Sequence, residues 1–586
     1  MRNRRGRGSG AGLRPSDSSG RGGWRLLLPP GIRRPQVFHQ GVRGYLARVR
    51  QFRPRCRRIF PPGHSGGKFV SAEPSPEVWR GRTSAPATLR AQPSEAGRFG
   101  RNFAFAAVGQ LVAQVLTFVL SISLARRFDP SIYGIFVFGF AFPSWFLLLV
   151  SLGLDEAIST NVAADRSRAR RYLTTVALLR LLLVAIALVA LWVATQIVLA
   201  DPLARSVTML LGSASVISSY ANTFNSIFRA FERFEYPALV TIVERSVTVG
   251  ISLRLLSLGR SLLEVCVVFL IGSLITLALS GAIATRKFAF FTKAVNARTL
   301  KEIVKTAIPF GLANTVATFV FTTGLVLLTI LRDSASTGLF NAAFTLLFGM
   351  FSFLSILSGT LLPMMSRLSQ ESRRKLARAL QRIQKLALIA GVPLALGGWF
   401  YADAIIALFY GTAFLPAADS FRILVFSFCV DTAMMGNAPA LAAIGKMKLV
   451  LYIGCVAAAS TIALSLLLIP PFGAVGAAYA FFVSHLLAAG LGAVAVRRLI
   501  SPLGTSRMMV KSAFAGFVML FVLVALPRLP LLLGVATGAA VYFAVLFAIR
   551  GASKEDRALV GEALRGALPI AVVRRFIGMV RGALMR

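Results

Sequence analysis

Three ionisable residues lie inside long apolar stretches of this sequence. Arg180 falls within the stretch 174–197, and Glu244 and Arg245 fall within the stretch 237–258. A charged group is costly inside a bilayer and usually faces a partner or a ligand pathway. If both stretches are membrane helices running in the same direction, these side chains lie at similar depth. We therefore expect Arg180 to contact Glu244 and Arg245 to face a cavity.

A guanidinium in such a cavity can hold a phosphate group through two hydrogen bonds. Arg180 and Arg245 are thus candidate ligand-binding residues, and Glu244 is a candidate coupling or ion-pair residue. The alternative is a buried ion pair that only stabilises the helices.

Polar residues also share one face of the apolar stretch 207–228. They are Asn222 and Asn225, with Arg229 one helical turn further on. Amide groups can bind the hydroxyl groups of a ligand, or they can hold neighbouring helices together. Asn314 and Asn341 would add to the same surface if they point inward.

Other charged residues lie near the centres or ends of apolar stretches. Asp431, in the stretch 420–442, would titrate in a proton-coupled cycle or pair with a polar neighbour. Asp155 and Glu156 are expected to pair with Arg229 or Arg233. Three further arginines flank the predicted outer ends of helices, where they would receive phosphate or extend to lipid head groups. These outer arginines are Arg126, Arg127 and Arg332.

Histidine and cysteine are too scarce and too scattered for a metal centre. The histidines are His39, His64 and His485, and none of the four cysteines forms a C-x-x-C pair. Paired catalytic acids are not evident either. We therefore predict no metal, no cofactor, no disulfide framework and no enzymatic activity.

The apolar stretches that carry these residues predict the fold class, an all-α integral membrane protein. Hydrophobic residues make up 56% of the 586 residues and charged residues only 15%. About 20 consecutive apolar residues span a bilayer as a helix, and a barrel strand would alternate instead. About fourteen transmembrane helices are predicted, at 103–125, 133–153, 174–197, 207–228, 237–258, 262–284, 308–331, 338–362, 385–408, 420–442, 449–469, 474–495, 509–526 and 530–548.

The distribution of positive charge predicts the orientation of these helices. The formal net charge is +43, which by itself would suit a nucleic-acid partner. However, arginine and lysine concentrate in the N-terminal region and in every second connection between apolar stretches, as the positive-inside rule requires. We expect both termini to be cytoplasmic, in a cell inner membrane, with membrane lipids and not nucleic acid as the partner of the basic surface.

Both ends of the chain differ from the helical region. Residues 1–98 are rich in Arg, Gly, Pro and Ser, which predicts a disordered basic extension or, alternatively, an organellar transit peptide. Residues 550–586 end in a basic amphipathic segment, expected to lie on the cytoplasmic leaflet.

An internal repeat indicates two lobes. The segment from Arg127 to Phe136 and the segment from Arg332 to Phe340 both place an arginine at a helix end and a G-x-F at the next helix start. Since six helices separate the two copies, they have the same orientation, as in transporters built from parallel repeats. We expect an N-lobe at 99–284, a C-lobe at 285–500, and an additional helix pair at 501–549.

Several short motifs resemble one known family. Asn102, Gly109-Gln110-Leu111, Leu124-Ala125-Arg126 and Tyr133-Gly134 resemble the first helix of the polysaccharide flippases (Wzx-type) of the multidrug/oligosaccharidyl-lipid/polysaccharide (MOP) exporter superfamily. Ile308-Pro309-Phe310, Leu362-Pro363, Leu441 to Lys446 and Ile469 to Ala478 are similar to later segments of that family. An acid often found in the seventh helix of these proteins is absent, since Thr322-Thr323-Gly324-Leu325 stand there.

This resemblance implies a flippase that moves a polyprenyl-pyrophosphate-linked oligosaccharide to the outer leaflet by alternating access. Its expected partners are the lipid-linked oligosaccharide and the polymerase and glycosyltransferases of one surface-polysaccharide pathway. A peptidoglycan-precursor flippase or a drug exporter of the same superfamily is the alternative. A membrane polysaccharide polymerase is a more remote alternative from a different class.

Overall fold

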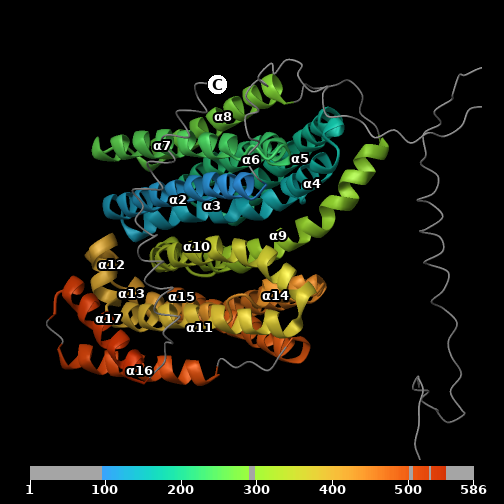
Figure 1. The fold of residues 1–586 in the computed structure, drawn as a ribbon. Helices are drawn as coiled ribbons and strands as arrows, with labels where there is room; N and C mark the ends of the chain where they lie inside the picture. The colour runs from blue at the N-terminus through green and yellow to red at the C-terminus, as the bar shows by residue number, and fades with distance from the viewer. Residues whose placement is uncertain (1–94, 289–296, 501–505, 527–528, 550–586) are drawn as a thin grey trace, which may run out of the picture. The chain divides into compact units, whose positions relative to one another are not determined.

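The computed structural model describes residues 95–288, 297–500, 506–526 and 529–549 (Figure 1). Every regular element in these ranges is a helix, which confirms the predicted all-α class. The predicted N-terminal extension up to residue 94 and the predicted amphipathic tail from residue 550 lie outside the described residues. The α-helices are α2 (Glu95–Arg127), α3 (Pro130–Ser151), α4 (Leu154–Ala164), α5 (Ala169–Val198), α6 (Pro202–Ala230), α7 (Glu235–Ser257), α8 (Leu262–Lys287), α9 (Ala297–Leu331), α10 (Ser334–Glu371), α11 (Arg373–Phe400), α12 (Ala402–Tyr410), α13 (Ala417–Ala433), α14 (Asn437–Ala443), α15 (Met447–Leu499), α16 (Ser506–Ala525) and α17 (Leu531–Ala548).

Each of the fourteen predicted spans falls on helical chain. Within the described ranges, eleven helical segments are long and apolar enough to cross a membrane. α6 and α7 are not among them, and α15 counts once although it is broken in the middle. The protein is therefore a multi-pass membrane protein, and fourteen crossings stay a prediction.

Several predicted spans are interrupted at residues with unusual backbone angles. The chain leaves the α-helical conformation after α3, where Leu152 and Gly153 have φ angles of 39° and 76°. Gly436, with φ 88°, separates α13 from α14. Such left-handed angles favour glycine, so at Gly153 and Gly436 the break itself is encoded locally.

The two halves of α15 are separated by a sharp turn at Gly473, whose φ and ψ are 56° and −129°. Pro470 and Pro471 precede it, and neither proline can donate a backbone hydrogen bond. A Cβ added at Gly476 would lie 2.0 Å from the carbonyl oxygen of Leu468, so the chain reverses tightly here. The two halves are thus the separate helices predicted at 449–469 and 474–495.

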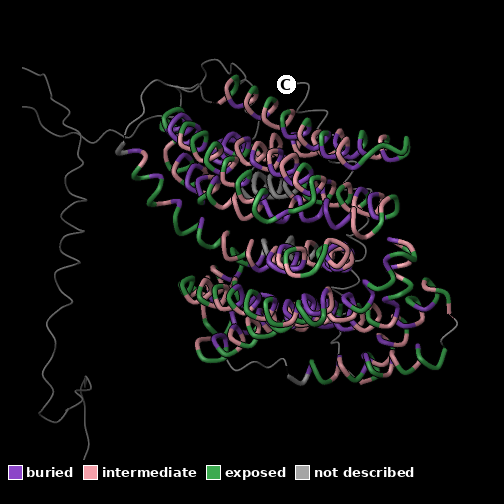
Figure 2. Tube along the Cα trace, turned by 180° about the vertical axis from the view of Figure 1, so that it is seen from behind, coloured by how far each residue is buried: buried purple, intermediate pink, exposed green. Residues whose placement is uncertain are grey.

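The helices pack as two groups. α2–α8, the first helix group, lie in the upper part of Figure 1, and α9–α17, the second helix group, lie in the lower part. Contacts between the groups run mainly through α3, which packs on α9 and α10, and through α4, which packs on α9. Buried residues follow these lines of contact, as the purple segments in Figure 2 show. That the two groups are lobes related by an internal repeat stays a prediction.

The two groups touch most closely where α3 and α10 begin. Asp129 and Asp333 cap the two helices, and Gly134 and Gly338 each follow five positions later. A Cβ at Gly134 would lie 1.7 Å from the carbonyl oxygen of Ser334, and a Cβ at Gly338 would lie 2.1 Å from that of Pro130. The backbones are therefore in direct contact at this end, which the charge pattern predicts to face outward. We call it the predicted outer end.

A second close contact lies at the opposite end, the predicted inner end. A Cβ on Gly153, between α3 and α4, would lie 2.2 Å from the carbonyl oxygen of Ala307 on α9. A Cβ on Gly311 would lie 2.6 Å from the carbonyl carbon of Leu152. Small residues allow such approach of helix backbones in membranes.

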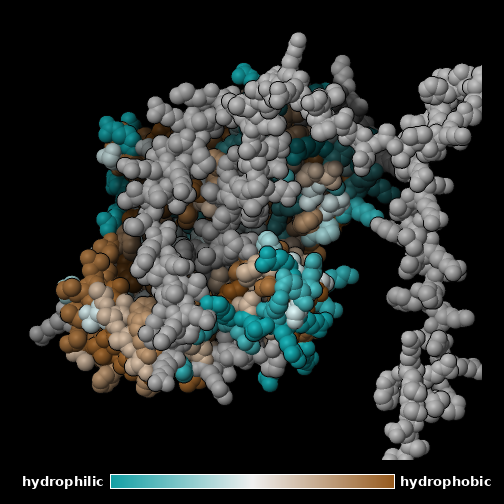
Figure 3. Space-filling model, viewed as in Figure 1, coloured by the Kyte–Doolittle hydropathy of each residue, from teal (hydrophilic) through white to brown (hydrophobic). Residues whose placement is uncertain are grey.

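The surface is divided between apolar and charged regions. In Figure 3 brown, apolar residues cover the side formed by α12, α16 and α17, and teal residues gather where α10 meets α11. Exposed arginines and a lysine at that junction account for the teal region, namely Arg367, Arg373, Arg374 and Lys375. An apolar belt with a basic end suits a protein that sits in a bilayer.

The glycine contact at the predicted outer end can be tested with Gly338→Ala. Its methyl group would force α3 and α10 apart, and overpacking of this kind costs about 1–3 kcal/mol. We expect a lower melting temperature for the detergent-solubilised protein, measured by intrinsic fluorescence. Gly349→Ala is the matched control on the same helix, because a Cβ at Gly349 meets nothing within 4 Å. Equal melting temperatures for the two variants would contradict the contact.

Candidate functional site

Arg180 is the centre of a buried network in the first helix group. Its side chain is fully buried on α5 and is 0% exposed, and the carboxylate of Asp155 on α4 is 15% exposed. Nη1 and Nη2 donate to the two carboxylate oxygens of Asp155, at 2.9 and 3.1 Å. This is a bidentate ion pair, the strongest geometry for arginine and a carboxylate.

The remaining donors of Arg180 bind two further helices. Nε donates to the carbonyl oxygen of Val150 at the end of α3, at 3.2 Å. Nη1 also donates to the carbonyl oxygen of Ser219 and to the hydroxyl of Thr223 on α6, at 3.0 and 2.8 Å. One guanidinium therefore joins α3, α4, α5 and α6. In this conformation it has no surface left for a ligand.

The predicted contact between Arg180 and Glu244 is wrong. Glu244 lies beside its chain neighbour Arg245, with Oε2 and Nε 3.2 Å apart, and accepts a hydrogen bond from Thr248. Both residues are on α7, which packs against α2 and α8. Similar depth in two helices does not determine which face of each helix meets the other.

The predicted pairing of Asp155 with Arg229 or Arg233 is also wrong. Arg233 is bound to Glu235, and Arg229 donates to the hydroxyl of Ser226 at 3.0 Å. That hydroxyl in turn donates to Asp155 at 3.0 Å. Arg229 is thus connected to Asp155 through Ser226.

A polar cavity of about 480 Å³ opens beside this network. α4 and α6 of the first helix group form most of its wall, and α9 of the second contributes one residue. The lining residues are Asp155, Glu156, Ser159, Thr160, Asn222, Arg229 and Phe310. Asn314 on α9 donates to Glu156 at 3.3 Å, which links the two helix groups at the cavity edge.

The three residues predicted to share a face of α6 divide between two roles. Asn222 and Arg229 line the cavity. Asn225 is buried and points elsewhere, since it donates to Asn222 at 3.2 Å and accepts from Ser280 on α8 at 3.2 Å. Its contacts are those of a residue that holds helices together.

Two of the three arginines at the predicted outer end bind free backbone carbonyls. Arg126 at the end of α2 donates to the carbonyl oxygens of Leu408 and Phe409, the last turn of α12 in the second helix group. Arg332 donates to the carbonyl oxygen of Pro470, just before the turn in α15, at 3.0 Å. Arg127 is exposed and makes no hydrogen bond or ion pair with the described residues. Asn341 donates to the hydroxyl of Tyr133 at 2.9 Å, across the two groups.

Asp431 on α13 is paired with His485 on α15, with Oδ2 and Nδ1 3.1 Å apart. The sequence analysis anticipated a polar neighbour for Asp431 but not its identity. The sequence feature that could have predicted this pair is the presence of an aspartate and a histidine, each within an apolar stretch.

Comparison with known proteins agrees with this architecture. The sequence profile of the family described as "Polysaccharide biosynthesis protein" matches residues 99–369, from α2 into α10. A structure titled "Lipid II flippase MurJ, inward closed conformation" is similar with a TM-score of 0.64 at 15% identity, covering 75% of this chain and 97% of that one. The helical fold of this chain is thus similar to that of this flippase.

Two other structures of MOP-superfamily transporters share the fold. An inward-facing multidrug resistance MATE family transporter has a TM-score of 0.55 at 15% identity, covering 68% of this chain and 99% of that one. A transporter from Pyrococcus furiosus has a TM-score of 0.52 at 15% identity, covering 70% and 96%. No curated protein sequence matches the chain. At this identity the likeness concerns the fold alone.

Removing the charge of Asp155 tests the buried ion pair with Arg180. Asp155→Asn leaves the guanidinium of Arg180 buried without its counter-charge, which typically costs about 3–5 kcal/mol. The matched control is Glu371→Gln, which removes an exposed acid paired with Arg367 and Lys375 and should cost less than about 1 kcal/mol. Melting temperature and yield of folded protein report the difference. Equal stability of both variants would argue against the pair as an anchor.

Arg126→Gln tests the contact between α2 and α12. Losing hydrogen bonds from a charged donor should favour separation of the two helix groups at the predicted outer end. In a background without the four native cysteines, spin labels at Ser257→Cys and Ala413→Cys would report the distance across that end. We expect the long-distance population to rise about threefold to tenfold in Arg126→Gln and to stay unchanged in Arg127→Gln. The opposite ranking would contradict this assignment.

Proposed function

We propose that this protein is a transporter of the MOP superfamily and a flippase for a polyprenyl-pyrophosphate-linked oligosaccharide, which it moves from the cytoplasmic to the outer leaflet for surface polysaccharide synthesis. One observation carries the proposal. The same helix bundle contains a polar cavity of about 480 Å³ and a separate apolar pocket of about 650 Å³. A ligand with a hydroxyl-rich head and a long hydrocarbon tail would use both.

The polar cavity has the chemistry to bind a saccharide. Asn222 can donate to and accept from hydroxyl groups. Ser159 and Thr160 donate to backbone carbonyls of their own helix and can accept from a ligand, as can Glu156. Arg229 adds a guanidinium that can bind an anionic or hydroxyl oxygen. Since the cavity is bounded by α4 and α6 on one side and α9 on the other, a change in spacing of the helix groups would alter it directly.

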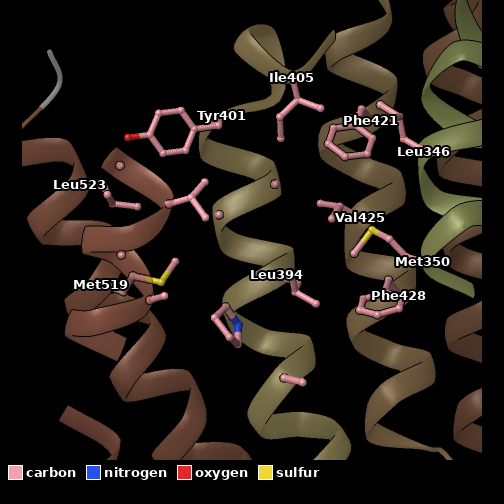
Figure 4. A pocket seen from close by; sticks show the side chains of 18 of the residues that line it. Leu346, Met350, Leu394, Tyr401, Ile405, Phe421, Val425, Phe428, Met519 and Leu523 are labelled. Carbon is pink, nitrogen blue, oxygen red and sulfur yellow. The ribbon is translucent and has the colours of Figure 1, made fainter. Parts of the chain in front are cut away.

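The apolar pocket has the chemistry to hold a polyprenyl chain. It lies between α10, α11, α13, α16 and α17, and Figure 4 shows Leu394, Met519, Leu523 and Phe428 directed into it. Tyr401 contributes a phenol ring, whose hydroxyl lies against Gly534 of α17. Each buried methylene of a ligand contributes about 0.8 kcal/mol, so a long prenyl tail would bind here without any polar contact.

Alternating access supplies the mechanism. Gly134, Gly338 and Arg126 hold the helix groups together at the predicted outer end, while the polar cavity lies near the predicted inner end. The head group would enter this cavity from the cytoplasmic side and leave outward once the contacts at the two ends exchange. The lipid tail would remain in the bilayer or the apolar pocket throughout, and no covalent step is needed.

A peptidoglycan-precursor flippase is the second candidate. The observation that favours it is the TM-score of 0.64 with a lipid II flippase, against 0.55 with a multidrug transporter. The match of residues 99–369 to a polysaccharide biosynthesis family favours the first candidate. Both candidates place the protein in the inner membrane with cytoplasmic termini, beside the glycosyltransferases and polymerase of its pathway.

Reconstituted protein provides the test. Proteoliposomes with a fluorescent polyprenyl-pyrophosphate-linked oligosaccharide should show loss of inner-leaflet label only when the protein is present. Arg229→Ala and Asn222→Ala should slow flipping at least about tenfold, because each removes a hydrogen-bonding group from the cavity wall. Arg233→Ala is the matched control, since Arg233 follows the end of the same helix by three residues and lies outside the cavity.

The two candidates predict different outcomes in this assay. Flipping of lipid II in preference to the oligosaccharide carrier would favour the second candidate. Absence of flipping for both lipids, with folded protein present, would contradict the proposed function. In the native host, a deletion strain should accumulate lipid-linked repeat units on the inner leaflet; accumulation of flipped but unpolymerised units would indicate a polymerase instead.

A further inference from the structure

His485 and Asp431 form an intramembrane pair that the transport scheme above does not use. Asp431 lies on α13 and His485 on the second half of α15, and their side chains are 33% and 14% exposed. Nδ1 of the imidazole is 3.1 Å from the carboxylate. Nε2 is buried and has no hydrogen-bond partner among the described residues. A buried ring nitrogen without a hydrogen bond lowers the stability of the fold, so its presence at this position calls for an explanation.

The carboxylate side of this pair is open to a cavity of about 190 Å³. Besides the pair, its wall is formed by apolar residues and by Asn437, which accepts a hydrogen bond from Gln384 of α11. Asp431 and His485 are the only titratable groups among the lining residues. The neighbouring helices bring uncharged groups to the pair. Asn437 comes from α14, Gln384 of α11 binds Asn437, and α9 and α10 contribute aromatic rings. The cavity is large enough for several water molecules, which can exchange a proton with the pair.

The imidazole is wedged between rings of three helices. Phe481 on its own helix lies 4.1 Å away between ring centroids, Phe351 on α10 lies 6.0 Å away in a stacked arrangement, and Phe321 on α9 lies 6.3 Å away. α9 and α10 carry Gly311 and Gly338, the contacts between the two helix groups. A change in the charge of His485 therefore alters its interaction with α9 and α10, the helices that join the two groups.

We propose that the His485–Asp431 pair is a proton-binding site, and that its protonation is coupled to the movement of α9 and α10 during transport. With the proton bound, imidazolium and carboxylate form a neutral ion pair, and the cation is attracted to the faces of the surrounding rings. When the proton leaves to water in the cavity, a neutral imidazole and a bare carboxylate remain, with net charge −1. The attraction to Phe321 and Phe351 weakens, which loosens α9 and α10 around the ring.

This inference rests on the protein being a transporter with two states, but not on the identity of its substrate. Both measurements below therefore omit lipid-linked saccharides. Failure here would leave the proposed flippase function standing, and failure of the flipping assay would leave the proton site standing.

The first measurement observes the proton directly. Because the chain has three histidines, replacing His39 and His64 by Gln leaves His485 as the single imidazole in the full-length protein. Nitrogen-15 NMR of histidine-labelled protein in lipid nanodiscs follows its protonation from pH 5 to 9. In Asp431→Asn the midpoint of this titration should differ from that of the parent protein, because a neutral amide replaces the carboxylate beside Nδ1. Asp403→Asn, which removes an exposed acid bound to Arg422, should leave it unchanged.

An imidazole that keeps one protonation state across this range would overturn the proposal. The same midpoint in Asp431→Asn and Asp403→Asn would overturn it as well.

The second measurement tests coupling. Spin labels at Ser257→Cys and Ala413→Cys, in the background without native cysteines, report the distance across the predicted outer end at pH 5.5 and 8.5. We expect the ratio of short to long distances to change at least threefold between these pH values, and this change to vanish in His485→Gln. A pH response that persists in His485→Gln, or no pH response in the parent protein, would refute the coupling.

Discussion

Backbone carbonyls left unpaired at helix ends and breaks must find hydrogen-bond donors, and much of this structure depends on how they do so. A carbonyl within a lipid-embedded bundle needs an internal donor, because water is not available to it. Arginine supplies that donor at three places. Arg180 binds the carbonyl of Val150 where α3 ends, Arg126 binds those at the end of α12, and Arg332 binds Pro470 before the turn in α15. Each guanidinium thereby fixes a helix end relative to another helix, so cavity walls and group contacts depend on it.

Apart from Arg126, which joins α2 to α12, the contacts between the two helix groups are of a different kind. At both ends of the bundle glycine lets backbones touch, through Gly134 and Gly338 at one end and Gly153 and Gly311 at the other. Few hydrogen bonds cross between the groups beside these contacts, among them Tyr133 to Asn341 and Glu156 to Asn314. Dispersion contacts and single neutral or singly charged hydrogen bonds can break and reform at modest cost. The rigid arginine networks lie mostly inside one group, whereas the interface between groups is held weakly, as the proposed alternating-access mechanism requires.

The sequence predicted the helices well and the side-chain partners poorly. Apolar length located the long helices but not α4. The shared G-x-F motif predicted an internal repeat, but not the close contact at Gly134 and Gly338. The position of Arg180 along its helix could be estimated from the sequence, but the direction in which its side chain points could not. The predicted partner was therefore Glu244, whereas the actual partner is Asp155. The predicted helix at 133–153 ends at Gly153, as in the structure, but the apolar profile does not predict α4, which brings Asp155 to Arg180. Asp431 and His485 are 54 positions apart, and only the reversal at Gly473 brings their helices together.

The charge balance of the polar cavity bears on which part of a lipid-linked sugar it would bind. Asp155 is neutralised by Arg180, and Glu156 shares a hydrogen bond with Asn314, so the wall carries one further acid and one guanidinium, Arg229. A pyrophosphate placed there would be attracted by Arg229, but the negatively charged carboxylate of Glu156 would repel it. Hydroxyl groups have no such conflict, since Glu156 can accept from them and Asn222 and Arg229 can donate to them. The cavity therefore suits the saccharide of the proposed substrate better than its pyrophosphate, and the surrounding hydroxyls of Ser159 and Thr160 extend the same preference along α4.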